Sequence, residues 1–279
     1  MATLTELLTD LHAEFADIRT LIGSLAPHDP AWDLATPAEG WAVRDQVSHL
    51  AFFDDAGRRA MVEPAAFAEE ARQALERAGD PMEEHLTKGR SMDGDELLAW
   101  WDDAHTGMVR VFAHADPRGR VPWYGPPMGV LSFISARLME TWAHGHDIAD
   151  ALASPREPTD RLHHVAHLGV RARPFSYLVR GREVPEGRID VDLVAPSGER
   201  WEWVVGNEVG DGGGTIGPSP STVTGPALDF CLVVTQRRHL DDTALTISGD
   251  TAVEWMSLAQ AFAGPPGPGR PPRLDQAPS

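Results

Sequence analysis

The sequence predicts an α+β protein in which an N-terminal up-and-down helical bundle precedes a small α+β domain with an antiparallel sheet. Three observations predict this fold. The chain has 279 residues, a length typical of two domains. Apolar residues recur every three or four positions up to about residue 175, as in amphipathic helices, and alternate with polar residues beyond about residue 187, as in strands. We therefore expect domains over 1–175 and 186–263, and a disordered Gly- and Pro-rich tail over 264–279.

The bundle is expected to contain six helices, each bounded by turn-forming residues or by a capping signal. Their expected ranges are 4–25, 43–63, 65–79, 94–112, 131–152 and 159–173. Proline residues end the first two, at Pro27, Pro30 and Pro64. The fourth begins at a capping box, in which Asp93 precedes Glu96 by three residues.

The second domain is expected to begin with a hairpin. Residues 188–196 and 198–208 both alternate apolar with polar residues and are joined by a Pro-Ser-Gly turn, so they should pair antiparallel. A Gly-rich stretch, 209–222, leads to a helix around 226–238. A short strand at 244–249 and a last helix at 251–263 complete the domain.

Composition excludes several classes of function. Basic residues number 24 against 42 acidic ones, and the net charge of −18 opposes binding to nucleic acids and to anionic membranes. No basic segment precedes the first apolar residues and no apolar run is long enough to span a membrane, so we expect a cytoplasmic protein. The single cysteine, Cys231, excludes an intramolecular disulfide. We expect a monomer or a homodimer that acts on a small molecule.

A polar stripe on the helix at 131–152 indicates where chemistry takes place. Arg137, Glu140, His144 and Asp147 are spaced by three, four and three residues and share one face of a helix that is otherwise largely apolar. Glu140 and His144, at positions i and i+4, can bind one metal ion together. The alternative is a surface pair of an acidic and a basic side chain, which this spacing also produces.

A third metal ligand is expected from the helix at 43–63, where His49 lies among apolar residues. Three nitrogen or oxygen ligands with an open position are typical of catalytic zinc, although iron, nickel or cobalt suit the same set. Asp45, four residues before His49, and Asp147, three after His144, are each expected to orient an imidazole.

The segments GWAVRDQVSHL and ARLMETWAHGHDIADAL, about ninety residues apart, resemble the mycothiol-dependent maleylpyruvate isomerase family, within the DinB-like metal-binding four-helix bundles. The segment VTGPALDFCLVVTQRR, together with ALTISGD and the final helix, resembles that family's sterol-carrier-like C-terminal domain. The resemblance implies a divalent metal, usually zinc, on His49, Glu140 and His144. It also implies a thiol cofactor, mycothiol, which binds the metal through its sulfur.

Positive charge is expected near the site if the substrate carries a carboxylate. The resemblance places an arginine of the second domain at the interdomain cleft, which points to Arg237 or Arg238, while Arg137 lies one turn before Glu140 on the polar stripe. A guanidinium suits a carboxylate because it can donate two parallel hydrogen bonds. The alternative for Arg238 is a solvated helix end.

Aromatic residues and one further histidine are expected around the cofactor. Trp123 and Tyr124 precede the helix at 131–152 and are expected to cover the open metal position, the alternative being a loop that covers the bundle core. His146, near the end of the polar stripe, is expected at the rim of the site.

The function that combines these expectations is a metal-dependent isomerase or thiol transferase that activates a thiol for isomerisation or S-transfer on a small, carboxylated substrate. Two alternatives stay open. One is an enzyme, for example of a biosynthetic pathway, whose metal acts as a Lewis acid without mycothiol. The other is a non-catalytic protein that binds a metal or a ligand.

Overall fold

The structure is a computed structural model that describes residues 2–76, 83–206, 221–267 and 269–273, apart from the side chains of residues 75, 83 and 84. The chain divides into two compact units, Met1–Arg156 and Glu157–Ser279. The boundary falls earlier than the expected residue 175, because the helix near 159–173 packs within the second unit. The expected Gly-rich stretch and disordered tail lie largely or partly outside the described residues.

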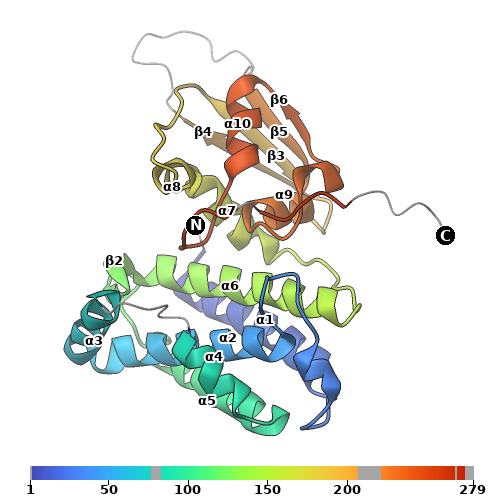
Figure 1. Cartoon of the computed structure of the whole chain (residues 1–279). Coiled ribbons are helices and arrows are strands. Elements are labelled where there is room, and N and C mark those ends of the chain that lie inside the picture. Colours follow the sequence, from blue (N-terminus) through green and yellow to red (C-terminus); the bar gives the residue numbers. More distant parts are fainter. Residues whose placement is uncertain (1, 77–82, 207–220, 268, 274–279) are drawn as a thin grey trace, which may run out of the picture. The chain divides into compact units, whose positions relative to one another are not determined.

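The N-terminal unit is helical, as predicted (Figure 1). The expected helices of this unit are all present, and a further short helix, α4, was not predicted. The bounds are α1 Leu4–Ile22, α2 Val43–Val62, α3 Pro64–Glu76, α4 Glu83–Arg90, α5 Gly94–Phe112 and α6 Val130–Ala151.

Capping boxes fix the beginnings of α1 and α5. The Thr3 hydroxyl accepts from the backbone N–H of Glu6, whose carboxylate accepts from the backbone N–H of Thr3. Asp93 and Glu96 make the same reciprocal pair at α5, which confirms the predicted capping box. Each box satisfies backbone N–H groups that have no partner within the helix.

The core of this unit lies between α1, α2, α5 and α6. Helix α2 packs against both α5 and α6, and α1 packs against α6. Fully buried apolar side chains fill the space, among them Ile18, Trp32, Leu50 and Trp101. Because α2 packs on α6, side chains of the two helices meet in the interior of the bundle. Of the polar stripe on α6, Arg137, His144 and Asp147 are buried.

The loop before α6 forms a short hairpin that was not predicted. Strand β1, Arg120–Trp123, pairs antiparallel with β2, Gly125–Gly129. The turn contains Gly125 at φ +120°, a conformation that favours glycine. Strand β2 was not predicted because it contains two prolines, and proline within a sheet is largely confined to edge strands.

The C-terminal unit is an α+β unit. Its helices and strands are α7 Leu162–Arg171, α8 Arg173–Leu178, β3 Ile189–Val194, β4 Arg200–Val205, β5 Ser221–Pro226, α9 Ala227–Val234, β6 Thr246–Ser248 and α10 Asp250–Leu258 (Figure 1). The sheet order is β4-β3-β5-β6. The predicted β3–β4 hairpin is confirmed, and β5 and β6 also pair antiparallel, whereas β3 and β5 run parallel.

Helix α7 belongs to this unit because it packs closely on α9. A Cβ atom added at Gly169 would lie 2.7 Å from a Val234 methyl, so only glycine permits this approach. Cys231 on α9 is fully buried, and its sulfur lies 3.6 Å from the carbonyl oxygen of Leu162 on α7. Strand β5 was not predicted, because its sequence STVTGP is rich in turn-forming residues.

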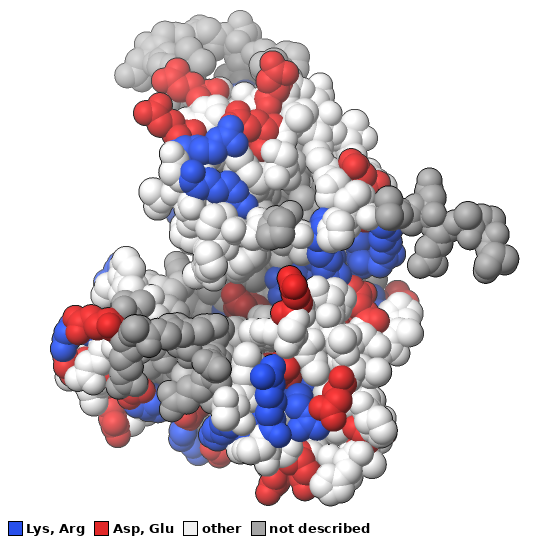
Figure 2. Space-filling view, in the orientation of Figure 1, with Lys and Arg blue, Asp and Glu red and all other residues white. Residues whose placement is uncertain are grey.

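The surface carries both signs of charge. On the face of the N-terminal unit that Figure 2 shows, basic and acidic side chains are interspersed. In the same unit, Arg72 on α3 pairs with both Glu69 and Glu76. Among the described helices, none is both long enough and apolar enough to cross a membrane.

Candidate metal centre

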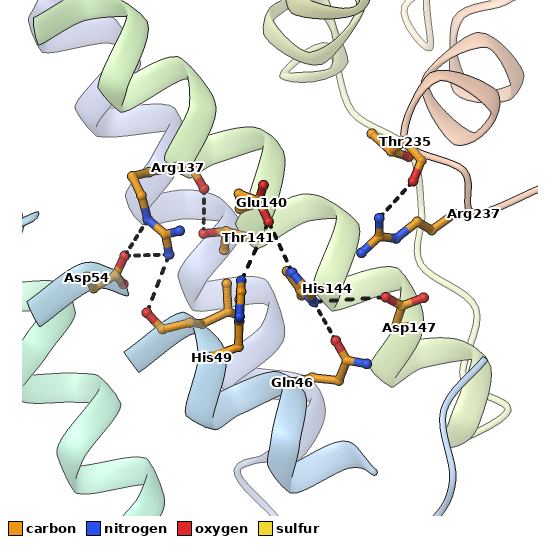
Figure 3. Close-up of polar contacts among 11 residues, drawn as sticks. Gln46, His49, Asp54, Arg137, Glu140, Thr141, His144, Asp147, Thr235 and Arg237 are labelled. Atoms are coloured by element: carbon orange, nitrogen blue, oxygen red, sulfur yellow. Dashed lines mark hydrogen bonds and ion pairs between the residues drawn. The ribbon is translucent and has the colours of Figure 1, made fainter. Parts of the chain in front are cut away.

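Three predicted ligands from two helices meet inside the N-terminal unit. One ligand atom from each of His49, Glu140 and His144 lies within 4.8 Å of the others. Nε2 of His144 lies 3.1 Å from Oε2 of Glu140, and Nε2 of His49 lies 3.7 Å from the same oxygen. Figure 3 shows His49 on α2 pointing toward Glu140 and His144 on α6. We call these three residues the His-Glu-His cluster.

Two members of this cluster, His49 and Glu140, are in the protonation states that bind metals. Burial, with the nearby His144, lowers the pKa of His49 to about 3, so its imidazole is neutral at pH 7. Burial would raise the pKa of Glu140, but hydrogen bonds and charge from His144 and His49 lower it well below the ordinary value, so Glu140 is a carboxylate. Metal ligands must be deprotonated, and both are.

Gln46 determines which nitrogen of His144 faces Glu140. The Thr36 hydroxyl donates to the Trp41 carbonyl oxygen, so it accepts from the amide NH₂ of Gln46 at 2.8 Å. The Gln46 carbonyl oxygen is then the atom that accepts from Nδ1–H of His144. In the neutral imidazole, Nε2 therefore carries a lone pair.

This arrangement leaves one short contact to be bridged. Nε2 of His144 lies 3.1 Å from a carboxylate oxygen of Glu140. The contact is favourable when a proton or a metal ion lies between the two atoms. His49 adds a second imidazole nitrogen, so the set of two imidazoles and one carboxylate fits a divalent metal.

The two aspartates expected to orient the imidazoles do not do so. Asp45 caps α2, where it accepts from the backbone N–H of Ala42, and it pairs with Arg90 at 2.8 Å. Asp147 lies 4.0 Å from Nδ1 of His144, beyond hydrogen-bond distance. Gln46 takes the place expected for them, because its position one turn before His49 places it on the same face of α2.

Arg137 is the partner of a buried carboxylate. Its Nε and Nη2 atoms donate to Asp54 on α2 at 3.0 and 2.8 Å, and Nη2 also donates to the carbonyl oxygen of Leu50. Trp101 donates to the other Asp54 oxygen, and His105 lies 3.4 Å from it. Arg137 thus links α6 to α2 one turn from the cluster (Figure 3).

Aromatic rings surround the cluster. The Trp41 ring stacks on His144 with centroids 5.9 Å apart, and Phe53 lies 4.6 Å from His49. His85, on the unpredicted helix α4, is buried with its ring 5.5 Å from that of His49. Because such rings exclude water, they strengthen electrostatic interactions at the site.

The remaining predicted residues of the N-terminal unit lie farther from the cluster. Trp123 and Tyr124 contact Phe53, with ring centroids 5.9 and 6.0 Å from the centroid of its ring. Phe53 in turn contacts His49. His146 is buried and packs edge-on against Trp142 at 4.4 Å, and its ring is not part of the cluster. The expectation that these three residues contact a cofactor stays a prediction.

Arg237 and Arg238 follow α9 in the C-terminal unit. Both backbone N–H groups donate to the carbonyl oxygen of Leu232, which ends the helix, and Arg237 also donates from Nη1 to the carbonyl oxygen of Thr235 at 2.7 Å. Their expected contact with a substrate stays a prediction.

Three residues near the cluster had no role in the sequence analysis: Gln46, Asp54 and His85. Gln46 and Asp54 lie three residues before and five after His49, so helical spacing alone could have placed Gln46 on the ligand face. The roles of Asp54 and His85 depend on contacts with other helices.

Comparisons with known proteins agree with this architecture. Residues 11–149 match the model of the mycothiol maleylpyruvate isomerase N-terminal domain. Two uncharacterized proteins of Mycobacterium tuberculosis, MT0041 and Rv0036c, are each 40% identical over 266 residues, 94% of this chain and 97% of theirs.

Solved structures show the same fold. Two crystal structures of a mycothiol-dependent maleylpyruvate isomerase, one of them a histidine-to-alanine mutant, align with a TM-score of 0.56 at 14% identity. The alignment covers 90% of this chain and 94% of each of those chains. The chain belongs to the mycothiol maleylpyruvate isomerase family.

Proposed function

We propose that this protein is a metal-dependent enzyme whose divalent metal, most simply zinc, is held by His49, Glu140 and His144. The observation that carries the proposal is the convergence of these three ligand atoms within 4.8 Å inside a helical bundle. Two imidazoles and one carboxylate leave at least one coordination position open, which is typical of catalytic rather than structural zinc. Iron, nickel and cobalt suit the same ligands.

We further propose that the open position receives a thiol, and the family points to mycothiol. When bound, the metal lowers the pKa of a coordinated thiol so that a thiolate exists at neutral pH. The protein itself offers no such thiol, because Cys231 is the single cysteine and burial raises its pKa well above the ordinary value. The nucleophile must therefore come from outside the chain.

The protein's own residues position and enclose this chemistry. Gln46 holds His144 with Nε2 toward the ligand cluster. Trp41 and Phe53 cover the imidazoles. Because Arg137 pairs with Asp54, we assign it a positioning role rather than the substrate contact first expected. Trp123, Tyr124 and His146 remain proposed contacts of the thiol cofactor.

The reaction proposed is isomerisation or S-transfer on a small, carboxylated substrate. Arg237 and Arg238 are the proposed contacts of the carboxylate, since the chain is strongly acidic and a substrate anion needs specific cations. The single buried cysteine is in keeping with a reducing compartment, and we place the activity in the cytoplasm.

The test has two parts. The zinc-loaded protein is titrated with mycothiol in a calorimeter, and isomerisation of maleylpyruvate is assayed in the presence of mycothiol. We expect saturable binding that the His49→Ala variant lacks. An absence of binding at millimolar mycothiol, with zinc still bound, would refute the thiol mechanism and favour direct Lewis-acid action on the substrate. An absence of zinc binding would remove both enzymatic mechanisms.

A further inference from the structure

A buried arginine in the C-terminal unit has no acidic partner among the described residues. Arg173, the first residue of α8, is 2% exposed. Its Nη2 atom donates to the carbonyl oxygen of Pro185 at 2.8 Å, whereas its Nε atom is buried and makes no hydrogen bond within the described part of the chain. A guanidinium stays charged inside a protein, and an unpaired buried charge is costly. A charge buried in this way is expected to have a counterion.

A second buried donor adjoins this arginine. Tyr177, one turn later on α8, is fully buried, and its hydroxyl likewise makes no hydrogen bond with the described residues. The guanidinium carbon of Arg173 lies 5.8 Å from the centroid of the Tyr177 ring. Burial raises the pKa of Tyr177 above the ordinary value, so the hydroxyl keeps its proton at pH 7 and can donate. Nε–H of Arg173 and O–H of Tyr177 are thus two neighbouring donors, each in need of an acceptor.

Positive charge prevails around these donors. The guanidinium of Arg182 lies 6.0 Å from the centroid of the Tyr177 ring and pairs with Glu254 on α10. In the described part of the chain, the charged groups that act on the Tyr177 hydroxyl are Glu254, Arg173 and Arg182. Two guanidinium groups and one carboxylate leave one positive charge.

A carboxylate is the anion that matches this charge. It carries a single negative charge and two acceptor oxygens, one for each buried donor. A phosphate dianion would instead leave an excess negative charge in a buried place.

The ion pair between Arg182 and Glu254 offers a way to the donors. Its two side chains are 51% and 33% exposed. Residues 181–184 are exposed, so the Arg182 side chain can move without unpacking the core. Because exposed ion pairs contribute little to stability, a ligand can displace Glu254 at low cost.

We propose that Arg173 and Tyr177 bind the carboxylate of a small, monoanionic organic ligand, and that Arg182 exchanges Glu254 for this carboxylate. All of these residues belong to the C-terminal unit, so the proposal does not rest on the proposed function. The alternative is a purely structural arginine that anchors the loop after α8 through Pro185.

The probes are acetate and benzoate, two monocarboxylates of different size, with acetamide and benzamide as their neutral counterparts. The full-length protein is titrated at constant ionic strength, and binding is followed by the ¹⁵N–¹H resonance of the Arg173 Nε–H group, which Arg173→Lys identifies by its loss. We expect at least one carboxylate to shift this resonance saturably, with a dissociation constant of about 1 mM or below, and the amides not to shift it.

Two variants keep the Arg173 resonance and test the site itself. Tyr177→Phe should weaken carboxylate binding about tenfold, because it removes one hydrogen bond to a charged group. Glu254→Gln should tighten binding about threefold or more, because the neutral side chain competes less for Arg182 and does not repel the ligand. The matched control is Glu202→Gln, which removes an exposed carboxylate of β4 and should leave the affinity unchanged.

Three results would overturn the proposal. The first is that neither carboxylate shifts the Arg173 resonance at tens of millimolar, or that the amides shift it equally, as a purely structural arginine predicts. The second is tighter binding of inorganic phosphate than of both carboxylates, which would exclude the monoanionic class. The third is an affinity that Tyr177→Phe and Glu254→Gln leave unchanged, since the carboxylate would then bind elsewhere.

Discussion

The buried ion pair between Asp54 on α2 and Arg137 on α6 yields a quantitative prediction. The two side chains are 1% and 4% exposed, and the closest nitrogen–oxygen distance is 2.8 Å. In the Arg137→Met variant the Asp54 carboxylate stays buried and keeps Trp101 and His105 as its polar partners among the described residues. Breaking a buried pair by removing one partner costs about 3–5 kcal/mol, a large part of the usual stability of a protein.

The assay is urea unfolding of the metal-free protein, so that metal binding does not contribute to the measured stability. Arg137→Met should lower the free energy of unfolding by about 3–5 kcal/mol. The double variant Asp54→Leu/Arg137→Met should recover at least about half of that loss, because no buried charge then remains. The exposed Arg72→Met variant, which breaks two surface pairs, is the control and should show no measurable loss.

Two results would refute this reasoning. One is a loss of less than about 1 kcal/mol in Arg137→Met, which is the value of an exposed pair. The other is a double variant whose loss in free energy of unfolding equals the sum of the losses in Asp54→Leu and Arg137→Met, since the two charges would then be energetically independent.

Three further predictions concern single residues. Gln46→Leu should weaken zinc binding about 10- to 100-fold, whereas Gln46→Glu, which keeps an acceptor for His144, should bind zinc as the wild type does. Equal zinc affinity in the wild type and in Gln46→Leu would exclude the role of Gln46 in orienting His144. Arg137 and His105 lower the pKa of Asp54 despite its burial, so its stabilising effect is complete above the ordinary value of 3.8 and is lost as the pH falls below it. Asp54→Asn should flatten this acid part of the stability curve measured with urea, and an unchanged curve would contradict the assignment. Cys231 should resist thiol reagents at pH 8 until the protein is unfolded, and rapid labelling of the native protein would show that it is accessible.

Local signals made much of the helical bundle predictable. The apolar stripe of α1 and the capping boxes of α1 and α5 involve residues three or four positions apart, so they are visible in the sequence. Helix α4 was not predictable in this way. It packs on α2, where the Ser48 hydroxyl donates to the carbonyl oxygen of His85 and Gly89 permits close approach to Ser48. Such a helix depends on tertiary contacts more than on its own eight residues.

In the candidate site, too, contacts between residues close in sequence were predictable and contacts between different helices were not. The spacing of Glu140 and His144 predicts that they share a face, and they do. The prediction that Asp45 orients His49 was wrong. A carboxylate in the first turn of a helix caps a backbone N–H group, and Asp45 does so instead of binding the side chain one turn later. The pairing of Arg137 with Asp54 could not be predicted, since the two residues lie 83 positions apart on different helices.

The most direct test of the metal centre is the zinc content and zinc affinity of the purified protein, compared with those of two histidine variants. The wild type should bind one zinc ion per chain. His49→Ala should bind it more than about 100-fold more weakly, because losing a ligand costs more than losing a group that orients one. The matched control, His146→Ala, removes a buried histidine outside the cluster and should retain the wild-type affinity. Equal zinc affinity in the wild type and in His49→Ala would contradict the assignment of the His-Glu-His cluster as a metal site.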